Sequence, residues 1–134
     1  MAKALALGAD AVSIGTAALI AIGDNDPKWE DEYNALGTTA GAYDAWHEGM
    51  DPAGITTQEP NLMKRLNPIA AGKLLSNYLK VMTLEAQTIA RACGKNHVHN
   101  LEPEDLCALS IEAAAMAAVP LAGTNWIPGK GQKE

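Results

Sequence analysis

The stretch from residue 42 to residue 58 concentrates side chains that can bind a metal, a ligand or another chain. It reads AYDAWHEGMDPAGITTQ and places a tyrosine, a tryptophan, a histidine, two aspartates and a glutamate among glycines and a proline. The pattern is too irregular for a helix and too polar for a buried strand, so it predicts a loop, and loops often carry binding residues. His47 and Asp51, with Glu48, are residue types that could coordinate a single metal ion here.

A second candidate site lies at the turn around Gly15 and Thr16. The residues AVSIG at 11–15 predict a short buried strand, and the apolar residues after Thr16 predict a helix that follows it directly. In parallel α/β proteins, ligands bind beyond the carboxyl ends of the strands, where a helix start offers free N–H groups to an anion. Gly15 would let the backbone approach a phosphate, and Thr16 would add a hydroxyl. Tight turns of this kind also serve packing, so these residues alone leave both functions open.

The other polar side chains favour structural roles. His97-x-His99 could supply two metal ligands, but the pair follows a helix end, where structural hydrogen bonding is the better interpretation. The acidic residues between positions 24 and 32 are typical of a solvated helix start. The sequence has no Ser–His–Asp triad, Walker loop or dinucleotide GxGxxG. Cys93 and Cys107 form no CxxC pair, which indicates reduced thiols in the cytoplasm.

The composition argues against several classes of protein. The 134 residues are 48% hydrophobic and 19% charged, as in a soluble globular chain, with a net charge of −6 and a pI near 5.0. This acidic balance argues against a nucleic-acid surface, which needs a basic patch. No apolar run reaches the roughly 18 residues of a membrane span, and the N-terminus shows no signal peptide.

Residues 1–23 predict one helix–strand–helix step that would position Gly15. A helix over 2–7 should end at Gly8, and the strand at 11–15 should lead into the apolar helix AALIAIG. A lone parallel strand cannot bury itself, because it needs neighbouring strands at its edges.

Residues 24–66 predict a helix followed by the polar loop. Asp26 and Pro27 are an N-cap and a first helical residue, and Tyr33 lies on the apolar face of the expected helix.

Residues 67–122 predict a helical region, and residues 123–134 a loose polar tail. The longest helix is expected over 68–93, and shorter helices should begin at Glu102 and at Ser110. The periodic apolar stripe of the long helix is expected to be core and not a cofactor site. It consists of Ala71, Leu74, Leu75, Tyr78, Leu79, Met82, Ala86, Ile89 and Cys93.

Several motifs together resemble one enzyme family. AKALALGADAVSIGTAAL looks like the last helix–strand–helix step of a flavin-dependent (β/α)8 barrel, as in IMP dehydrogenases and α-hydroxy-acid oxidases. GTAALIAIG, DPAGITTQEP, NYLKVMTLEAQTIARACG and HVHNLEPEDLCALS resemble the FMN-binding synthase domain of the glutamate synthase family, particularly archaeal-type and N-methylglutamate synthase-like large subunits. The likeness covers nearly the whole chain, and PxGITTQ is its most specific element. It implies an α/β fold: the C-terminal piece of a TIM barrel (last strand and helix), then a mostly α-helical C-terminal region.

The resemblance also implies what the matching loop binds in other members of the family. In the family this loop binds a three-iron, four-sulfide cluster through Cys-x-x-Cys-His-x-x-x-Cys-Pro-x-Gly, and here Tyr43, Trp46 and Asp51 stand at the cysteine positions. We therefore expect no metal ligands and no iron–sulfur cluster, because these side chains cannot replace three thiolates. Tyr43 and Trp46 are expected to fill the vacated volume. A single metal ion at His47 and Asp51, or a contact with a partner chain, remains an alternative.

The resemblance also implies an activity, an oxidoreductase acting on CH–NH2 donors. Glutamine-derived ammonia or amine would condense with 2-oxoglutarate, and reduced FMN would deliver a hydride to the product. Gly15, Thr16 and Ala17 would contact the FMN phosphate, and no catalytic residue is expected in this chain. The implied partners are the remainder of the barrel, from upstream sequence or another chain, and a glutaminase-type amidotransferase domain or subunit.

The chain is accordingly expected to be a cytoplasmic fragment that, taken alone, binds no FMN and catalyses nothing. Two other interpretations remain. The chain could be a non-catalytic structural or interaction subunit derived from the same family. It could also belong to another phosphate-binding barrel such as an IMP dehydrogenase relative, which would account for residues 1–22 only.

Overall fold

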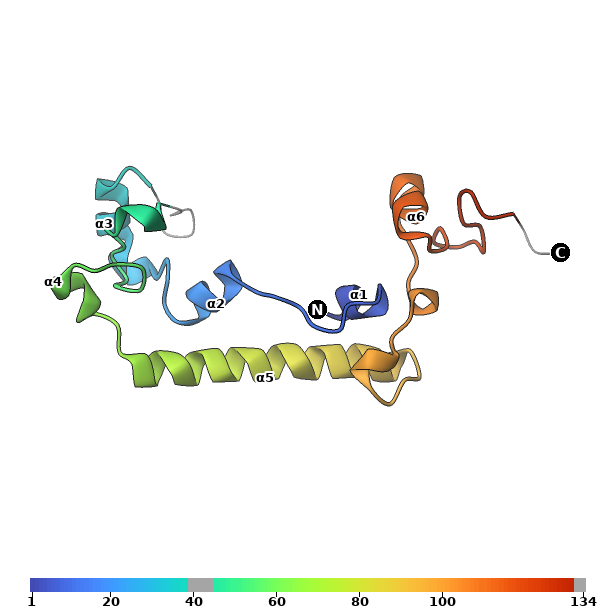
Figure 1. The fold of residues 1–134 in the computed structure, drawn as a ribbon, viewed down its shortest axis with the longest axis horizontal. Coiled ribbons are helices and arrows are strands. Elements are labelled where there is room, and N and C mark those ends of the chain that lie inside the picture. Colours follow the sequence, from blue (N-terminus) through green and yellow to red (C-terminus); the bar gives the residue numbers. More distant parts are fainter. Residues whose placement is uncertain (39–44, 132–134) are drawn as a thin grey trace. The chain divides into compact units, whose positions relative to one another are not determined.

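The structure is a computed structural model that describes residues 1–38 and 45–131, and helices make up about half of the chain (Figure 1). The chain divides into two compact units. One is Ile14–Lys80, and the other combines Met1–Ser13 with Val81–Glu134. No helix in the described part of the chain is long and apolar enough to cross a membrane.

The Ile14–Lys80 unit is built from short helices whose starts are fixed by side-chain caps. Asp26, Glu59 and Asn67 each accept hydrogen bonds from backbone N–H groups at a helix start, and a proline follows each cap. These caps confirm the helix starts that the sequence predicts at Asp26 and Asn67. The elements of the unit are α2 (Thr16–Ala21), η1 (Pro27–Trp29), α3 (Glu30–Ala35), η2 (Trp46–Glu48), α4 (Pro60–Met63) and the first part of α5 (Pro68–Ala92).

The other unit has a core of small side chains. Ser110 caps α6 by accepting a hydrogen bond from the Ala113 N–H, as predicted. Glu102, in contrast, starts only a single 3-10 turn, because the backbone at Leu106 is extended and leads away from helical geometry. The elements of the unit are α1 (Ala2–Ala6), the second part of α5, η3 (Val98–Asn100), η4 (Pro103–Asp105) and α6 (Ile111–Ala117). Its two buried clusters are Ala6, Ala90 and Leu101, and Ala108, Ala114 and Val119.

Helix α5 carries far more apolar surface than this chain buries. Ala71 and Ala86 of its predicted stripe are buried, but the larger members Leu74, Tyr78 and Ile89 are exposed. Leu79 is also exposed, so the prediction that the whole stripe is core is wrong for these four residues. The period of apolar residues identifies a helix face, but it does not say which chain covers that face.

The expected strand at 11–15 does not form in the described residues. The backbone from Ala11 to Ile14 has no regular hydrogen-bonded pattern, and the described chain contains only one isolated bridge, between Ala108 and Leu121. A parallel strand exists only through bonds to neighbouring strands, so this segment has nothing to pair with here. The flanking helices are present as α1 and α2.

Candidate functional site in the loop around Asp51

A buried tyrosine and a buried aspartate join helix α3 to the polar loop. Tyr33 on α3 and Asp51 in the loop are both fully buried. The Tyr33 hydroxyl donates a hydrogen bond to Asp51 Oδ1 at 3.2 Å and accepts one from the Asn25 N–H at 3.0 Å. Burial of its ring, reinforced by the nearby negative charges of Asp51 and Asp24, raises the pKa of Tyr33 above its usual value. Tyr33 is therefore a neutral donor to the carboxylate.

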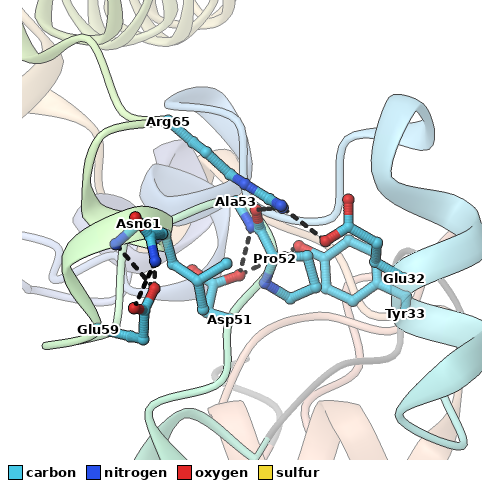
Figure 2. A network of polar contacts seen from close by, with 9 residues as sticks. Glu32, Tyr33, Asp51, Pro52, Ala53, Glu59, Asn61 and Arg65 are labelled. Atoms are coloured by element: carbon cyan, nitrogen blue, oxygen red, sulfur yellow. Dashed lines mark hydrogen bonds and ion pairs between the residues drawn. The ribbon is translucent and has the colours of Figure 1, made fainter.

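The Asp51 carboxylate also accepts hydrogen bonds from the backbone that follows it. Its Oδ1 accepts a hydrogen bond from the Ala53 N–H at 3.0 Å (Figure 2). Its Oδ2 accepts from the N–H groups of Ile55 at 2.8 Å and Thr56 at 3.1 Å. With Tyr33, four donors converge on two oxygens. Hydrogen bonds to a charged acceptor are the strong kind, and they are what allows a carboxylate to be buried.

Gly54 completes this turn by letting two backbone segments approach closely. Its φ is +77°, and a Cβ built on it would lie 2.1 Å from the carbonyl oxygen of Leu62. Only glycine fits such a position, both for its left-handed conformation and for the lack of space. The Gly in PxGITTQ is thus explained by packing against α4.

Further hydrogen bonds continue the loop into helix α4. The Thr57 hydroxyl donates to the Gly49 carbonyl, closing the loop across its base, and accepts from the Glu59 N–H at 3.0 Å. Glu59 then caps α4 by accepting from the Asn61 N–H at 2.8 Å (Figure 2) and from the Leu62 N–H, also at 2.8 Å. Most of the polar groups in this motif are used inside the protein.

Arg65 fastens the outside of the loop to helix α3. Its Nη1 donates to Glu32 Oε2 at 2.6 Å and to the Pro52 carbonyl at 2.9 Å, as Figure 2 shows. Its guanidinium lies 4.4 Å from the centre of the Trp29 ring, close enough for a cation–π contact. The Glu32 pair is partly exposed and contributes little alone, so the carbonyl and ring contacts make Arg65 specific to this place.

One side of the loop borders an open concave surface of about 590 Å³. Thr56 contributes a buried hydroxyl that has no hydrogen-bond partner among the described residues. The surface is lined by His47, Glu48, Gly49, Met50, Thr56, Thr57, Gln58 and Glu59.

The geometry of the described residues does not favour a metal at this loop. Both oxygens of Asp51 already accept hydrogen bonds, while His47 and Glu48 are exposed. The described part of the chain contains no group of three or more His, Cys, Asp or Glu residues that could hold a metal ion. Cys93 and Cys107 are free thiols and belong to the other unit.

The pair His97 and His99 also has a structural arrangement. His97 caps η3, because its Nδ1 accepts a hydrogen bond from the His99 N–H at 3.2 Å. The two rings pack edge to face with their centres 5.3 Å apart. This agrees with the structural hydrogen bonding that the sequence favoured.

The turn at Gly15 is the start of α2. Gly15 is its N-cap, and the first helical hydrogen bonds run from the N–H groups of Ala18 and Leu19 to the Gly15 carbonyl. The N–H groups of Thr16 and Ala17 therefore occupy the positions that have no intrahelical acceptor. Gly15 and Thr16 are exposed, and beyond the adjacent residues no atom of the described chain lies within 4 Å of the place a Gly15 Cβ would take.

The structure assigns Asp51 a role that the sequence reasoning missed. Asp51 was expected as the replacement of a cluster ligand or as a ligand of a single metal ion with His47, and Tyr33 only as part of an apolar face. The signal for Asp51 was the order Asp-Pro-x-Gly, which is typical of a turn whose aspartate binds its own backbone. Tyr43 lies outside the described residues, and the side chain of Trp46 is not described, so the expected filling of volume is not tested.

Comparison with known proteins links this loop to one family. A family model described as a conserved region in glutamate synthase matches residues 36–96. The chain is 83% identical over 131 residues to a glutamate synthase large subunit-like protein of Rhizobium meliloti. The aligned residues make up 98% of this chain and 30% of that protein.

More distant relatives give the same result. An archaeal glutamate synthase [NADPH] of Methanocaldococcus jannaschii is 37% identical over 74% of this chain and 16% of its own length. An archaeal-type glutamate synthase [NADPH] of Dehalococcoides mccartyi is 34% identical over 90% of this chain and 22% of its own length. The chain thus spans less than a third of each of these relatives. No solved structure matches. The comparisons confirm the resemblance to the glutamate synthase family, whose conserved region matches residues 36–96 of this chain.

Proposed function

We propose that this chain is the C-terminal part of an FMN-dependent glutamate synthase-like oxidoreductase. The observation that carries the proposal is 83% identity to a glutamate synthase large subunit-like protein across almost the whole chain. The reaction would be the reductive amination of 2-oxoglutarate with ammonia or an amine derived from glutamine. Because the chain spans 30% of that relative, the rest of the longer protein, or another chain, would supply the catalytic residues.

Gly15, Thr16 and Ala17 fit a role in holding the phosphate of FMN. The absence of a Cβ at Gly15 leaves open space beside an exposed helix start, and the N–H groups of the first helical turn favour an anion. The Thr16 hydroxyl can add a hydrogen bond. When bound, FMN supplies the hydride chemistry of the family. The share of this chain would be to hold and orient the cofactor from its phosphate end.

The family's iron–sulfur cluster does not fit the residues of this loop. Asp51 is buried and uses both oxygens within the protein, and residues 42–58 contain no cysteine. We therefore propose an enzyme without the cluster, whose electrons come from a soluble donor or a partner. The printed names of the relatives in Methanocaldococcus and Dehalococcoides include NADPH, which makes it the first donor to test.

The proposed partners are the remainder of the barrel and a glutaminase-type amidotransferase domain or subunit, in the cytoplasm. The exposed apolar side chains of α5 support the first of these. Several large apolar residues on one helix are expensive to leave in water, so a covering surface is expected. The net charge of −6 gives no support to a nucleic-acid partner.

The same apolar helix also favours a second candidate, a non-catalytic subunit that kept the scaffold for assembly. The two functions differ in flavin content and turnover. We expect the full-length protein to retain about one FMN per barrel and to form glutamate from glutamine and 2-oxoglutarate with NADPH. The absence of both flavin and turnover in a folded full-length protein would favour the structural subunit.

A matched pair of variants tests the part played by this chain. Replacing Thr16 by Val removes the hydroxyl at the proposed phosphate site and should weaken FMN retention several-fold. Replacing Thr124, whose hydroxyl donates to the Leu121 carbonyl in the other unit, by Val should leave it unchanged. Equal flavin retention in the Thr16 variant and the unchanged protein would remove the phosphate role.

A further inference from the structure

We propose that the Asp51 carboxylate is a positioning group that folds the PxGITTQ loop around itself, so that the loop keeps its shape without any metal or cluster. The inference goes beyond the proposed function, because it concerns how this segment is organised whatever reaction the full protein catalyses. It starts from the mismatch between the loop and the cluster of its family.

The donors around Asp51 require both of its side-chain oxygens to accept hydrogen bonds. Three backbone N–H groups and the Tyr33 hydroxyl converge on its two oxygens, and Asp51 has no salt bridge among the described residues. A carboxylate presents acceptor sites only, whereas a carboxylic acid would place a hydrogen against one of these donors. Asp51 is thus a buried anion whose charge is offset by hydrogen bonds and not by a cation.

The same hydrogen bonds connect the turn at Asn25, helix α3 and the loop that follows Asp51. Asn25 donates to Tyr33, Tyr33 donates to Asp51, and the carboxylate then fixes the backbone at Ala53, Ile55 and Thr56. That backbone leads directly into Thr57, which closes the loop onto Gly49.

The backbone that Asp51 holds in place forms part of the concave surface beside the loop. Thr56 and Thr57 line that surface, and Asp51 sets the direction of the backbone at Thr56. Gly54 holds the opposite side of the turn against Leu62. A metal would organise such a loop from its centre, and here a side chain of the loop does so.

Amide hydrogen exchange in the full-length protein tests this directly, because each bond to Asp51 protects one named amide. In the unchanged protein the amides of Ala53, Ile55 and Thr56 should be protected, and chelator treatment should not change them. Loss of their protection on removal of metal would overturn the inference.

Variants of Asp51 should give a pattern that simple packing would not. In Asp51→Asn, the side-chain oxygen can still serve Ile55 and Thr56, while the amide NH2 faces the Tyr33 hydroxyl, which can accept, and the Ala53 N–H, which cannot. Exchange should accelerate roughly tenfold or more at Ala53 and less at the other two amides. Equal acceleration at all three amides, or none, would contradict the proposed geometry.

Two controls separate this effect from general loosening. Asp31→Asn removes the same charge from an exposed position on α3 and should leave all three amides unchanged. The amides of Asn61 and Leu62, which bond to Glu59 and not to Asp51, should keep their protection in Asp51→Asn. If Asp51→Asn fails to fold, Tyr33→Phe still removes one donor while adding nothing, and it should change exchange at Asn25 and Ala53. No change at either amide would overturn the inference.

Discussion

The loop around Asp51 and the helix α5 differ in whether their side chains find partners within this chain. The loop is polar, yet the groups of its turn meet partners within the loop itself, α3 and α4. Helix α5 is regular and carries an apolar stripe, yet it leaves Leu74, Tyr78 and Ile89 exposed in this chain. Buried polar groups need hydrogen-bond partners close by, whereas an exposed apolar face can be buried later by a surface from another segment or chain. The turn from Asp51 to Glu59 therefore satisfies most of its polar groups within its own unit, with the Thr56 hydroxyl as an exception, whereas the apolar face of the helix lacks a covering surface in the described chain.

The largest effect is expected from removing the centre of the loop. Asp51→Ala leaves four donors without their acceptor, two of them fully buried and two partly buried, so we expect a loss of about 3–5 kcal/mol in the free energy of unfolding. Urea denaturation of the purified protein measures it. The exposed control Asp31→Asn should change stability by less than about 0.5 kcal/mol. Similar values for the two variants would mean that the loop is not held from within.

A somewhat smaller effect is expected at Gly54. In Gly54→Ala the new methyl group would collide with the Leu62 carbonyl, and the φ of +77° adds strain, so about 2–4 kcal/mol should be lost. Gly49→Ala is the matched control, since Gly49 has a φ of +69° and open space around it. The control should cost only about 1 kcal/mol, and equal costs would show that close packing against α4 does not matter.

Tyr33→Phe should have a moderate effect that depends on pH. Near neutral pH it removes one buried hydrogen bond to Asp51 and one from Asn25, at a cost of about 1–3 kcal/mol. Burial raises the pKa of Tyr33 in the folded protein, so its phenol ionises first in the unfolded chain. That contribution to stability is fully present below about pH 10 and is lost as the pH rises further.

The pH dependence separates this role from packing. Thermal unfolding followed from pH 8 to pH 11 should show a steeper loss of stability for the unchanged protein than for Tyr33→Phe. The two curves should therefore converge as the pH rises. Parallel curves over this range would show that the Tyr33 phenol titrates as it does in the unfolded chain.

The smallest effect within this chain is expected on α5. Leu74→Gln replaces an exposed side chain, so it should change the stability of the isolated chain by less than about 0.5 kcal/mol. In the full-length protein the same change should lower the thermal midpoint, if another surface covers this face. Ala86→Gln, at a buried position of the same helix, should destabilise both forms. A Leu74 variant that is silent in both would leave α5 a solvent-facing helix and weaken the contrast with the loop.

Local rules in the sequence predicted much of the backbone and little of the site. Caps and prolines marked the starts of η1, α5 and α6, because these signals act within a few residues. The pairing of Tyr33 with Asp51 spans 18 positions, so no periodic pattern reports it. The burial of α5 and the strand at 11–15 could not be predicted either, since both depend on surfaces that must come from other segments.

Iron and acid-labile sulfide measured in the full-length protein, purified with its flavin, test the central claim most directly. We expect FMN and activity with no stoichiometric iron or sulfide, in the unchanged protein and in Asp51→Asn alike. Stoichiometric iron and sulfide that are present in the unchanged protein and lost in Asp51→Asn would contradict it, because Asp51 would then serve a cluster and not the loop.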